Sequence, residues 1–373
     1  MLHEVPGQAE IGLPRLRWRG KADRVEYLRR AVTLEDVASA AGVSTATVSL
    51  VVRARDGVRP RTRERVQRAI DELGYIPNGL ARGLSNQRKE IIGLVAEEQR
   101  DDSVPLDRRN VVYRDEVLYG VEEALRREHW SLLISFMSNS DVDAIQSLLS
   151  KIDGLVAVIG TVEESILEQL AKRIPLVVVA GGTERARFDV VAADNAGGMR
   201  ALLDHLIVAH GYRSFTFVGG PDYAPDARER QRVFDAVMQA AGTSVVGRFH
   251  GSFVAQTGTD AAISIMKSAL PDVVVCANDP LAIAVMAELQ SHGIRVPDDV
   301  AVVGFDDIAM AAYASPALTT VRQPIRELGA TAARVLLQRI DDPERDLTVE
   351  TLPTTVVIRA SCGCEAGRPG QPE

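Results

Sequence analysis

Between residues 33 and 53, apolar side chains repeat at the spacing of two short amphipathic helices. The first set, spaced i, i+3, i+4 and i+7, consists of Leu34, Val37, Ala38 and Ala41. Thr33 is a suitable N-cap for this helix, and Gly42 allows a tight turn after it. Ser44 then caps a second helix. The pattern therefore predicts a helix-turn-helix over this stretch.

The second predicted helix has an apolar face and an outward face. The apolar positions are Val48, Val51 and Val52, which we expect to be buried. In a helix-turn-helix the outward face of the second helix can enter the major groove of DNA. We therefore expect DNA contacts from Ser44, Thr45, Ala46, Thr47, Ser49, Leu50 and Arg53.

Two further helical segments follow this pair. The first extends from about Thr62 to Leu73 and turns its apolar positions inward: Val66, Ala69, Ile70 and Leu73. Its outward arginines suit backbone phosphates, although an ordinary charged helix face explains any one of them equally well. These are Arg61, Arg63, Arg65 and Arg68. The second segment, residues 77–84, is too short to be stable alone in water and contains two glycines, so it needs DNA and a second copy to order it.

From Glu90 onward, apolar strands alternate with helices. The apolar β-rich runs lie at 91–96, 132–136, 155–159, 176–179, 215–218, 273–277 and 300–304. Helical patterns separate them at about 114–128, 162–173, 195–209, 226–241, 257–269 and 279–292. Continuous apolar strands between helices indicate parallel sheets covered on both faces. About 270 residues of this pattern predict two doubly wound halves, with a ligand between them at the carboxyl ends of the strands.

Charge is unevenly distributed along the 373 residues, whose 43 Lys/Arg and 51 Asp/Glu give a net charge of −8. Residues 1–90 hold 17 Lys/Arg and 11 Asp/Glu, a net of +6, which leaves −14 for residues 91–373. A basic head on an acidic body keeps DNA contact at one end. Residues 1–32 are a basic extension that we expect to be disordered. A phosphate-touching arm, a solvated tail and a start codon placed too far upstream remain open alternatives for it.

The sequence disfavours a membrane span, a secretion signal, a disulfide framework and the common catalytic motifs. No apolar run reaches the roughly 18 residues that cross a membrane, and residues 1–30 lack a signal-peptide core, so we expect a cytoplasmic protein without a membrane partner. Cys276, Cys362 and Cys364 are too few for a disulfide framework, and the histidines lack metal-ligand spacing. The Cys362–Cys364 pair could bind metal or respond to oxidation, but thiols without partners are more often inert. With no nucleophile, phosphate-loop or metalloprotease motif, we expect no enzymatic activity, no metal and no cofactor.

The motifs of the chain resemble the LacI/GalR family of bacterial transcription regulators. The headpiece resemblance rests on T-L-E-D-V-A-x-x-A-G-V-S-x-x-T-V-S at 33–49, T-R-E-R-V at 62–66 and G-Y-I-P-N at 74–78. The body is similar to the family's regulatory core, which is built like periplasmic sugar-binding proteins. Its matching stretches include DNAGG at 194–198, HL at 205–206, VGGP at 218–221, ANDPLAIAVM at 277–286, VPDDVAVVGFDDI at 296–308 and LTTVRQP at 318–324.

The resemblance implies an α/β fold. An N-terminal all-α helix-turn-helix headpiece would precede a periplasmic-binding-protein-like core of two doubly wound parallel-sheet subdomains. The implied parts are the extension at 1–32, the DNA-binding domain at 33–76, a hinge helix and linker at 77–89, an effector-binding and dimerisation core at 90–361 and a tail at 362–373. In that architecture the chain crosses between the halves three times, here near Asp189, Arg322 and Ile340.

Two features of the DNA-binding part come from the resemblance. Asn78, Ala81 and Leu84 match the family's hinge helix, in which the leucine wedges into the minor groove and kinks the duplex. Leu50 departs from the family pattern, which often has arginine at that position. The departure puts the usual operator sequence in doubt.

The resemblance also implies an effector site. Arg230 matches the arginine that clamps the effector, Asn278 and Asp306 match positions that hydrogen-bond it, and Phe253 replaces an aromatic residue that stacks on it. An arginine fork, an amide, a carboxylate and a flat ring suit a polar, orientation-specific cleft. The competing interpretation of Arg230 and Asp306 is an interdomain salt bridge. The long charged loop at 97–111 and the Ala180–Gly181 strand end depart from the pattern and put a simple sugar in doubt.

These features together predict a sequence-specific DNA-binding transcriptional repressor. It would bind a palindromic double-stranded operator as a homodimer, controlled by a small-molecule effector such as a sugar or related metabolite. Two other functions fit the core alone: a periplasmic-type ligand-binding protein and a sugar-metabolising enzyme. The headpiece and the missing signal peptide oppose the first, and the missing catalytic motifs oppose the second. Salt-sensitive binding to palindromic DNA distinguishes all three.

Overall fold

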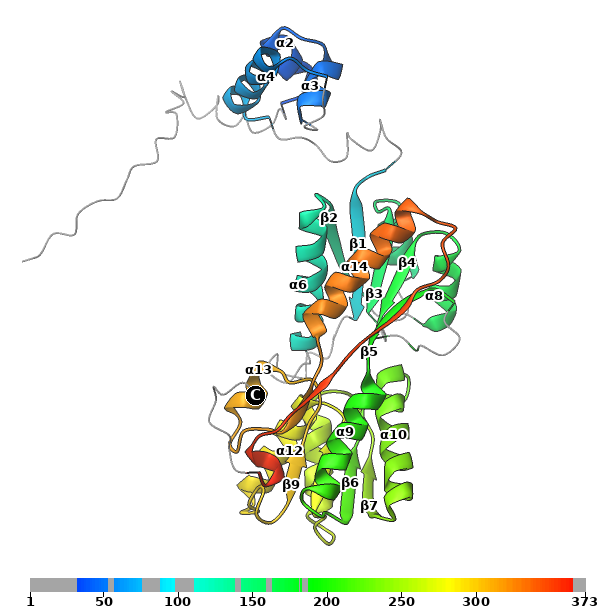
Figure 1. Ribbon diagram of the computed structural model, residues 1–373, viewed down its shortest axis with the longest axis vertical. Helices are drawn as coiled ribbons and strands as arrows, with labels where there is room; N and C mark the ends of the chain where they lie inside the picture. Colours follow the sequence, from blue (N-terminus) through cyan, green and yellow to red (C-terminus); the bar gives the residue numbers. More distant parts are fainter. Residues whose placement is uncertain are drawn as a thin grey trace, which may run out of the picture. The chain divides into compact units, whose positions relative to one another are not determined.

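The computed structural model describes residues 32–52, 57–75, 88–97, 111–137, 142–158, 163–180, 182 and 187–364. These residues fall into two compact units, one within residues 1–85 and the other within residues 86–373 (Figure 1). Residues 1–31 of the basic extension, Arg53, and the predicted hinge-helix residues Asn78, Ala81 and Leu84 lie outside the described residues. No helix in the described ranges is long and apolar enough to cross a membrane.

The first unit contains a three-helix headpiece made of α2 (Leu34–Ala41), α3 (Thr45–Val52) and α4 (Pro60–Leu73). The helices enclose a small apolar core whose buried members are Val37, Ala38, Ala41, Val48, Val51, Val66, Ala69 and Tyr75. Val52, which the sequence pattern places in this core, is only partly buried at its margin, because it is the last residue of α3.

Local sequence sets both ends of α2. The Asp36 amide donates to Thr33 Oγ1 at 3.2 Å, and the Thr33 amide donates to the Asp36 carboxylate at 2.8 Å. This reciprocal capping box fixes the start of the helix. Gly42 ends it with a φ of 59°, a left-handed conformation that favours glycine.

A six-stranded sheet forms one half of the second unit, in the order β11-β5-β4-β3-β1-β2. Its strands are β1 (Ile91–Glu97), β2 (Ser131–Met137), β3 (Gly154–Val158), β4 (Leu176–Val179), β5 (Asp189–Ala193) and β11 (Val349–Leu352). All of their pairings are parallel. One face packs against α6 (Val111–Arg127) and α14 (Ile325–Asp341), and the other packs against α7 (Val142–Leu149) and α8 (Glu164–Ala171).

A four-stranded parallel sheet forms the other half, in the order β7-β6-β8-β9. Its strands are β6 (Ser214–Val218), β7 (Ser244–Phe249), β8 (Val273–Cys276) and β9 (Ala301–Val303). The accompanying helices are α9 (Asn195–Val208), α10 (Pro225–Ala241), α11 (Ala255–Ile265), α12 (Asp279–Ser291) and the short α13 (Ala309–Tyr313). The two sheets are the two doubly wound α/β halves that the strand–helix alternation predicts.

Three segments connect the halves (Figure 1). The first joins the end of β5 to α9, and the second joins β10 (Thr320–Arg322) to α14. The third follows β11 and contains β12 (Thr355–Val357), which pairs antiparallel with β10. The expected third crossing near Ile340 is therefore wrong. Ile340 is 7% exposed and still belongs to the core of the six-stranded half.

The second unit also extends past the predicted boundary at residue 361. Cys362 closes the 3-10 turn η2 (Ala360–Cys362) and is fully buried in the core of the four-stranded half. Just before it, Ser361 Oγ donates to the Val302 carbonyl at 2.6 Å and accepts from the Thr319 amide at 2.9 Å. The region that we interpreted as a tail therefore begins, up to Cys364, as part of the folded core.

Glycines allow α6 and α14 to pack closely. A Cβ on Gly120 would overlap the Arg326 carbonyl oxygen, and a Cβ on Gly329 would overlap the Val117 carbonyl oxygen. Each helix thus presents a bare backbone position to the other, and any larger side chain there would push the two helices apart.

Candidate functional site

The predicted DNA-contacting residues of α3 lie on its accessible side. Ser44, Thr45 and Ala46 are exposed, and Thr47, Ser49 and Leu50 are partly exposed. Leu50 is absent from both the buried and the flanking members of the headpiece core. Its side chain is therefore available to a DNA groove.

Ser44 and Thr47 have a structural task besides any DNA contact. The Thr47 amide donates to Ser44 Oγ at 3.3 Å, and the two hydroxyl oxygens lie 2.9 Å apart. An N-cap of this kind stabilises a helix by about 1 kcal/mol. A substitution of Ser44 would therefore change helix stability together with DNA affinity.

Helix α4 carries the predicted phosphate-binding arginines. Arg61, Arg65 and Arg68 are exposed, whereas Arg63 is partly buried. Exposed arginines on one helix suit phosphate oxygens, which position a protein on DNA without selecting its sequence. The headpiece thus places positive charge on α4 and small or apolar side chains on the outward face of α3.

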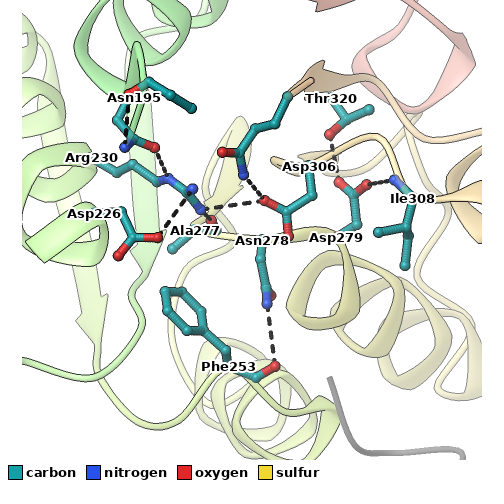
Figure 2. A network of polar contacts seen from close by, with 12 residues as sticks. Asn195, Asp226, Arg230, Phe253, Ala277, Asn278, Asp279, Asp306, Ile308 and Thr320 are labelled. Atoms are coloured by element: carbon teal, nitrogen blue, oxygen red, sulfur yellow. Dashed lines mark hydrogen bonds and ion pairs between the residues drawn. The ribbon is translucent and has the colours of Figure 1, made fainter. Parts of the chain in front are cut away.

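A buried polar network of the second unit is organised around Arg230, which α10 carries into the interior at 2% exposure (Figure 2). Its Nε donates to Asn195 Oδ1 at 2.7 Å, and its Nη1 donates to the Ala277 carbonyl at 2.6 Å. The guanidinium carbon lies 3.9 Å from the centroid of the Phe305 ring. Arg230 is thus oriented by α9, by the end of β8 and by an aromatic face at once.

Two buried carboxylates face the Arg230 guanidinium. Asp306 Oδ1 lies 3.5 Å from Nη1, and Asp226 Oδ2 lies 3.7 Å from Nη2. Both carboxylates belong to the four-stranded half, as does Arg230. The competing interpretation of an interdomain salt bridge does not describe these pairs, because they lie within one subdomain.

Asp306 combines an unusual backbone with a perturbed carboxyl. Its φ of 120° is rare for a residue other than glycine, and Gln323 Nε2 donates to its Oδ1 at 2.5 Å. Burial raises the pKa of Asp306 to about 7, against the opposing effects of Arg230 and Gln323. Near neutral pH this carboxyl can therefore carry a proton to donate or a charge to accept hydrogen bonds.

Asp279 is a further buried carboxyl, which the sequence analysis missed. Thr320 Oγ1 donates to its Oδ1 at 2.5 Å, and the Ile308 amide donates to its Oδ2 at 2.9 Å. Burial raises the pKa of Asp279 well above its usual value, and Asp306 adds to the rise. Asp279 ties the start of α12 to β10, where the second crossing begins. The Asn-Asp-Pro sequence, which begins a helix directly after a buried strand, could have identified Asp279 as a buried residue at this position.

Asn278 and Phe253 support each other at the edge of this network. Asn278 caps α12 by accepting from the Leu281 amide at 3.0 Å, and its Nδ2 donates to the Phe253 carbonyl at 3.2 Å. The partly buried Phe253 ring lies against Gly220, where a Cβ would overlap it. The structure thus brings all four predicted effector residues together, and the amide of Asn278 is already used to hold the framework.

Two polar atoms near Arg230 are buried without a hydrogen-bond partner among the described residues: Tyr113 Oη and Asp226 Oδ1. Tyr113 belongs to α6 of the six-stranded half; the residue is partly exposed, but its hydroxyl oxygen is buried. Burial, then Asp226 and Asp306, raise the pKa of Tyr113, and burial raises the pKa of Asp226. Orphaned buried polar atoms are uncommon and costly. Here they are a donor and an acceptor contributed by the two halves, which is what a bound polar molecule requires.

Comparison with known proteins supports two parts of this architecture. Residues 33–78 match the family model of bacterial regulatory proteins of the lacI family, and residues 203–362 match a periplasmic binding protein-like domain. The chain is 31% identical over 338 residues to the HTH-type transcriptional repressor PurR of Photobacterium profundum and 32% identical over 343 residues to PurR of Aliivibrio fischeri. Each match covers 88% of this chain and 98% of the relative.

Solved structures show the same likeness. The lac repressor dimer bound to operator and the anti-inducer ONPF superposes with a TM-score of 0.78 at 26% identity, covering 89% of this chain and 99% of that chain. The complex of the transcriptional regulator CelR with cellobiose gives a TM-score of 0.66 at 29% identity, covering 88% and 99%.

Proposed function

Since the chain belongs to the LacI family of bacterial regulatory proteins, we propose that it binds a palindromic DNA operator as a homodimer. It is a DNA-binding transcriptional repressor, and the proteins that it resembles along nearly their whole length are repressors rather than enzymes. The headpiece opposes a pure ligand-binding role. Its target is DNA, so the protein acts in the cytoplasm.

A small polar effector in the cleft around Arg230 controls operator binding. The observation that carries this part is the pair of unpartnered buried atoms, Tyr113 Oη and Asp226 Oδ1. A hydroxyl or a ring N–H can donate to Asp226, and a hydroxyl oxygen or ring nitrogen can accept from Tyr113. Sugars and related polyhydroxyl or nitrogen-ring metabolites have such groups on a compact frame. Because Tyr113 and Asp226 belong to different halves, the molecule that joins them favours one relative position of the halves.

Dimerisation is supported by apolar surface on α13. Tyr313 is 88% exposed and Met310 is 55% exposed on this five-residue helix. Large apolar side chains at such exposure suit a contact with a second copy. A two-fold dimer presents two headpieces to two half-sites, and its symmetry calls for a palindromic operator.

Operator selection from randomised double-stranded DNA with the full-length protein tests the DNA part. We expect symmetric half-sites and a dissociation constant that rises steeply with salt. Enrichment of no common sequence would contradict it. For the cleft, thermal shift with sugars, polyols and nucleobases identifies a ligand, whose effect on operator affinity is then measured. A ligand that stabilises the protein through Tyr113 and Asp226 without changing operator affinity would reject effector control while leaving the DNA role intact.

A further inference from the structure

Two histidines and two cysteines converge beside the end of α9. His205 lies in the last turn of α9 and His210 lies just beyond it, while Cys362 closes η2 and Cys364 follows two residues later. One ligand-capable atom from each of them lies within 4.8 Å of the others. Cys362 is buried and the other three are partly buried. The expectation that the two thiols lack partners is therefore wrong, because folding brings distant histidines to them.

Four of the six separations among these atoms are close to those of a tetrahedral metal site, and none of the six exceeds 4.8 Å. The two histidine Nε2 atoms are 3.2 Å apart. Cys364 Sγ lies 3.3 Å from His210 Nε2 and 3.6 Å from His205 Nε2, and Cys362 Sγ lies 3.7 Å from His205 Nε2. Zinc bonds of about 2.0–2.1 Å to nitrogen and about 2.3 Å to sulfur place tetrahedral ligand atoms about 3.3–3.8 Å apart.

We propose that this cluster binds one zinc ion through His205, His210, Cys362 and Cys364. Two imidazoles and two thiolates in a tetrahedron are the ligand set and geometry that zinc prefers. All four positions are supplied by the protein, so the site is closed and its role is structural rather than catalytic.

The local sequence suits this arrangement. The expectation that the histidines lack metal-ligand spacing is wrong for His205 and His210, because their His-x4-His spacing lies within the range common in zinc sites. The Cys-Gly-Cys turn is shorter than usual, and Gly363 makes it possible with a φ of 94°. A Cβ at Gly363 would also approach Tyr212 Oη to 3.1 Å. The glycine therefore lets both sulfur atoms face the same point.

Neighbouring side chains orient the ligands. Thr319 Oγ1 lies 3.1 Å from Cys362 Sγ and 2.9 Å from the Arg359 carbonyl oxygen, so its single proton can be donated to the sulfur or to the carbonyl. Tyr212 stacks on the His210 ring, with centroids 5.1 Å apart and an interplanar angle of 10°, and its hydroxyl donates to the Cys362 carbonyl at 2.9 Å. Such a second layer of contacts is typical of metal sites and holds the ligands in place without the ion.

The site would anchor the third crossing. The chain leaves the six-stranded half after Leu352 and reaches the four-stranded half at η2. Zinc between η2 and α9 would fix that end of the crossing, so that a change in the relative position of the halves must occur in the segment before it. The site is separate from the cleft around Arg230, and the proposal does not depend on an effector.

Metal analysis of the full-length protein tests the proposal. Protein purified without chelator from zinc-supplemented cells should contain one zinc ion per chain by elemental mass spectrometry. Cys364→Ser and His210→Asn should each lose most of that zinc. The matched controls Cys276→Ala, in β8, and His292→Asn, beyond the end of α12, should keep it. Zinc retained by both ligand variants would overturn the proposal.

A second measurement uses the unmodified chain, in case a ligand variant does not fold. Cobalt(II) added to metal-stripped protein should give a thiolate-to-cobalt charge-transfer band and the strong visible absorption of a tetrahedral site, saturating at one equivalent. Hydrogen exchange in residues 355–364 should slow when zinc is restored. A weak octahedral cobalt spectrum, or a mass lower by a pair of hydrogen atoms from a Cys362–Cys364 disulfide in protein alkylated at lysis, would each overturn the site.

Discussion

Arg339 and Asp189 form a two-pronged ion pair inside the six-stranded half, with Nε–Oδ2 and Nη2–Oδ1 distances of 2.9 and 3.0 Å. Asp189 opens β5 and is 1% exposed. Its Oδ1 also accepts from the Thr348 amide at 2.7 Å, while Arg339 donates to the Pro343 and Asp346 carbonyls at 3.1 and 2.9 Å. The pair therefore fastens the loop between α14 and β11 to the strand from which the first crossing departs.

Arg339→Met should destabilise the second unit by about 3–5 kcal/mol, because it leaves Asp189 buried without its counter-charge. Urea unfolding measures this change. Arg334→Met is the matched control on the same helix: Arg334 pairs with Glu350 at 2.8 Å, but its side chain is 49% exposed. An exposed pair of this kind contributes less than about 1 kcal/mol. Equal losses in the two variants would contradict the structural role of the buried pair.

Asp306 should make stability fall as pH rises. Its folded pKa of about 7 lies above the unfolded value, so its stabilising contribution is complete below about pH 4 and is lost between about pH 4 and 7. Asp306→Asn keeps the shape of the side chain while it removes the titration. The free energy of unfolding of the wild type minus that of the variant should drop by on the order of 1–4 kcal/mol across this window. Because Asp306 raises the pKa of Asp279, the change in Asp279 titration in the variant is part of the measured difference. If the difference in free energy of unfolding did not change with pH, Asp306 would be ionised throughout this window.

Much of the fold could be predicted because its central strands are continuous apolar runs. The sequence pattern missed strands β5, β7, β10, β11 and β12 and helices α7, α13 and α14. Among them, β5 and β7 escaped prediction for different reasons. β5 begins with Asp189, whose burial depends on Arg339 at the far end of α14. β7 lies at a sheet edge, where its side chains alternate between exposed and partly buried instead of forming an apolar run. In both segments the local sequence pattern does not distinguish a strand from a loop, and contacts with the rest of the folded protein make the segment a strand.

The residues around Arg230 likewise divide into those that the sequence alone identifies and those that depend on tertiary packing. Arg230, Asn278 and Asp306 stand in motifs that the sequence shares with a family, so they could be named without a structure. Tyr113 stands in an ordinary helical pattern, and its approach to Asp226 depends on how the two halves pack. The histidine–cysteine cluster was missed because its members are brought together from α9 and the end of the third crossing.

Tyr113→Phe should weaken effector binding with little effect on the fold. The change removes a buried hydroxyl that has no partner among the described residues, so unfolding stability should stay constant or rise slightly. Loss of one hydrogen bond to the ligand costs roughly two- to tenfold in affinity, measured by calorimetry. Tyr119→Phe is the control, on the same helix but 60% exposed. Arg230→Ala is less informative, because it also strips two buried carboxylates of their counter-charge. Equal ligand affinities in wild type and Tyr113→Phe would remove Tyr113 from the site.

Tyr313→Glu should weaken the dimer. A charge placed at an apolar contact between two copies must be desolvated, so we expect the dimer dissociation constant to rise at least about tenfold, which corresponds to about 1.4 kcal/mol. Analytical ultracentrifugation of the full-length chain measures it. Tyr223→Glu is a control at another exposed tyrosine, which lies before α10 and is 57% exposed. A dimer unaffected by Tyr313→Glu would place the contact between copies elsewhere.

Leu50 should decide one base pair of each operator half-site. Val48 and Val51 bury the opposite face of α3, and Leu50 is partly exposed without joining the headpiece core. An arginine at this position could bind guanine O6 and N7, with about 1–3 kcal/mol of discrimination. Leucine has no donor and offers only apolar contact, most naturally to a thymine methyl group.

We therefore expect A·T at the base pair under Leu50, where arginine-bearing relatives would select G·C. Leu50→Arg should move the preference at that base pair toward guanine and leave the other positions unchanged. Selection from randomised DNA with both proteins measures the shift, and Gln67→Arg, at an exposed position of α4, is the control for added charge alone. That control should raise affinity for all sequences, because phosphate contacts are blind to the bases. If wild type and Leu50→Arg enriched identical sites, Leu50 would pack away from the bases, and the choice of operator would have to come from its neighbours on α3.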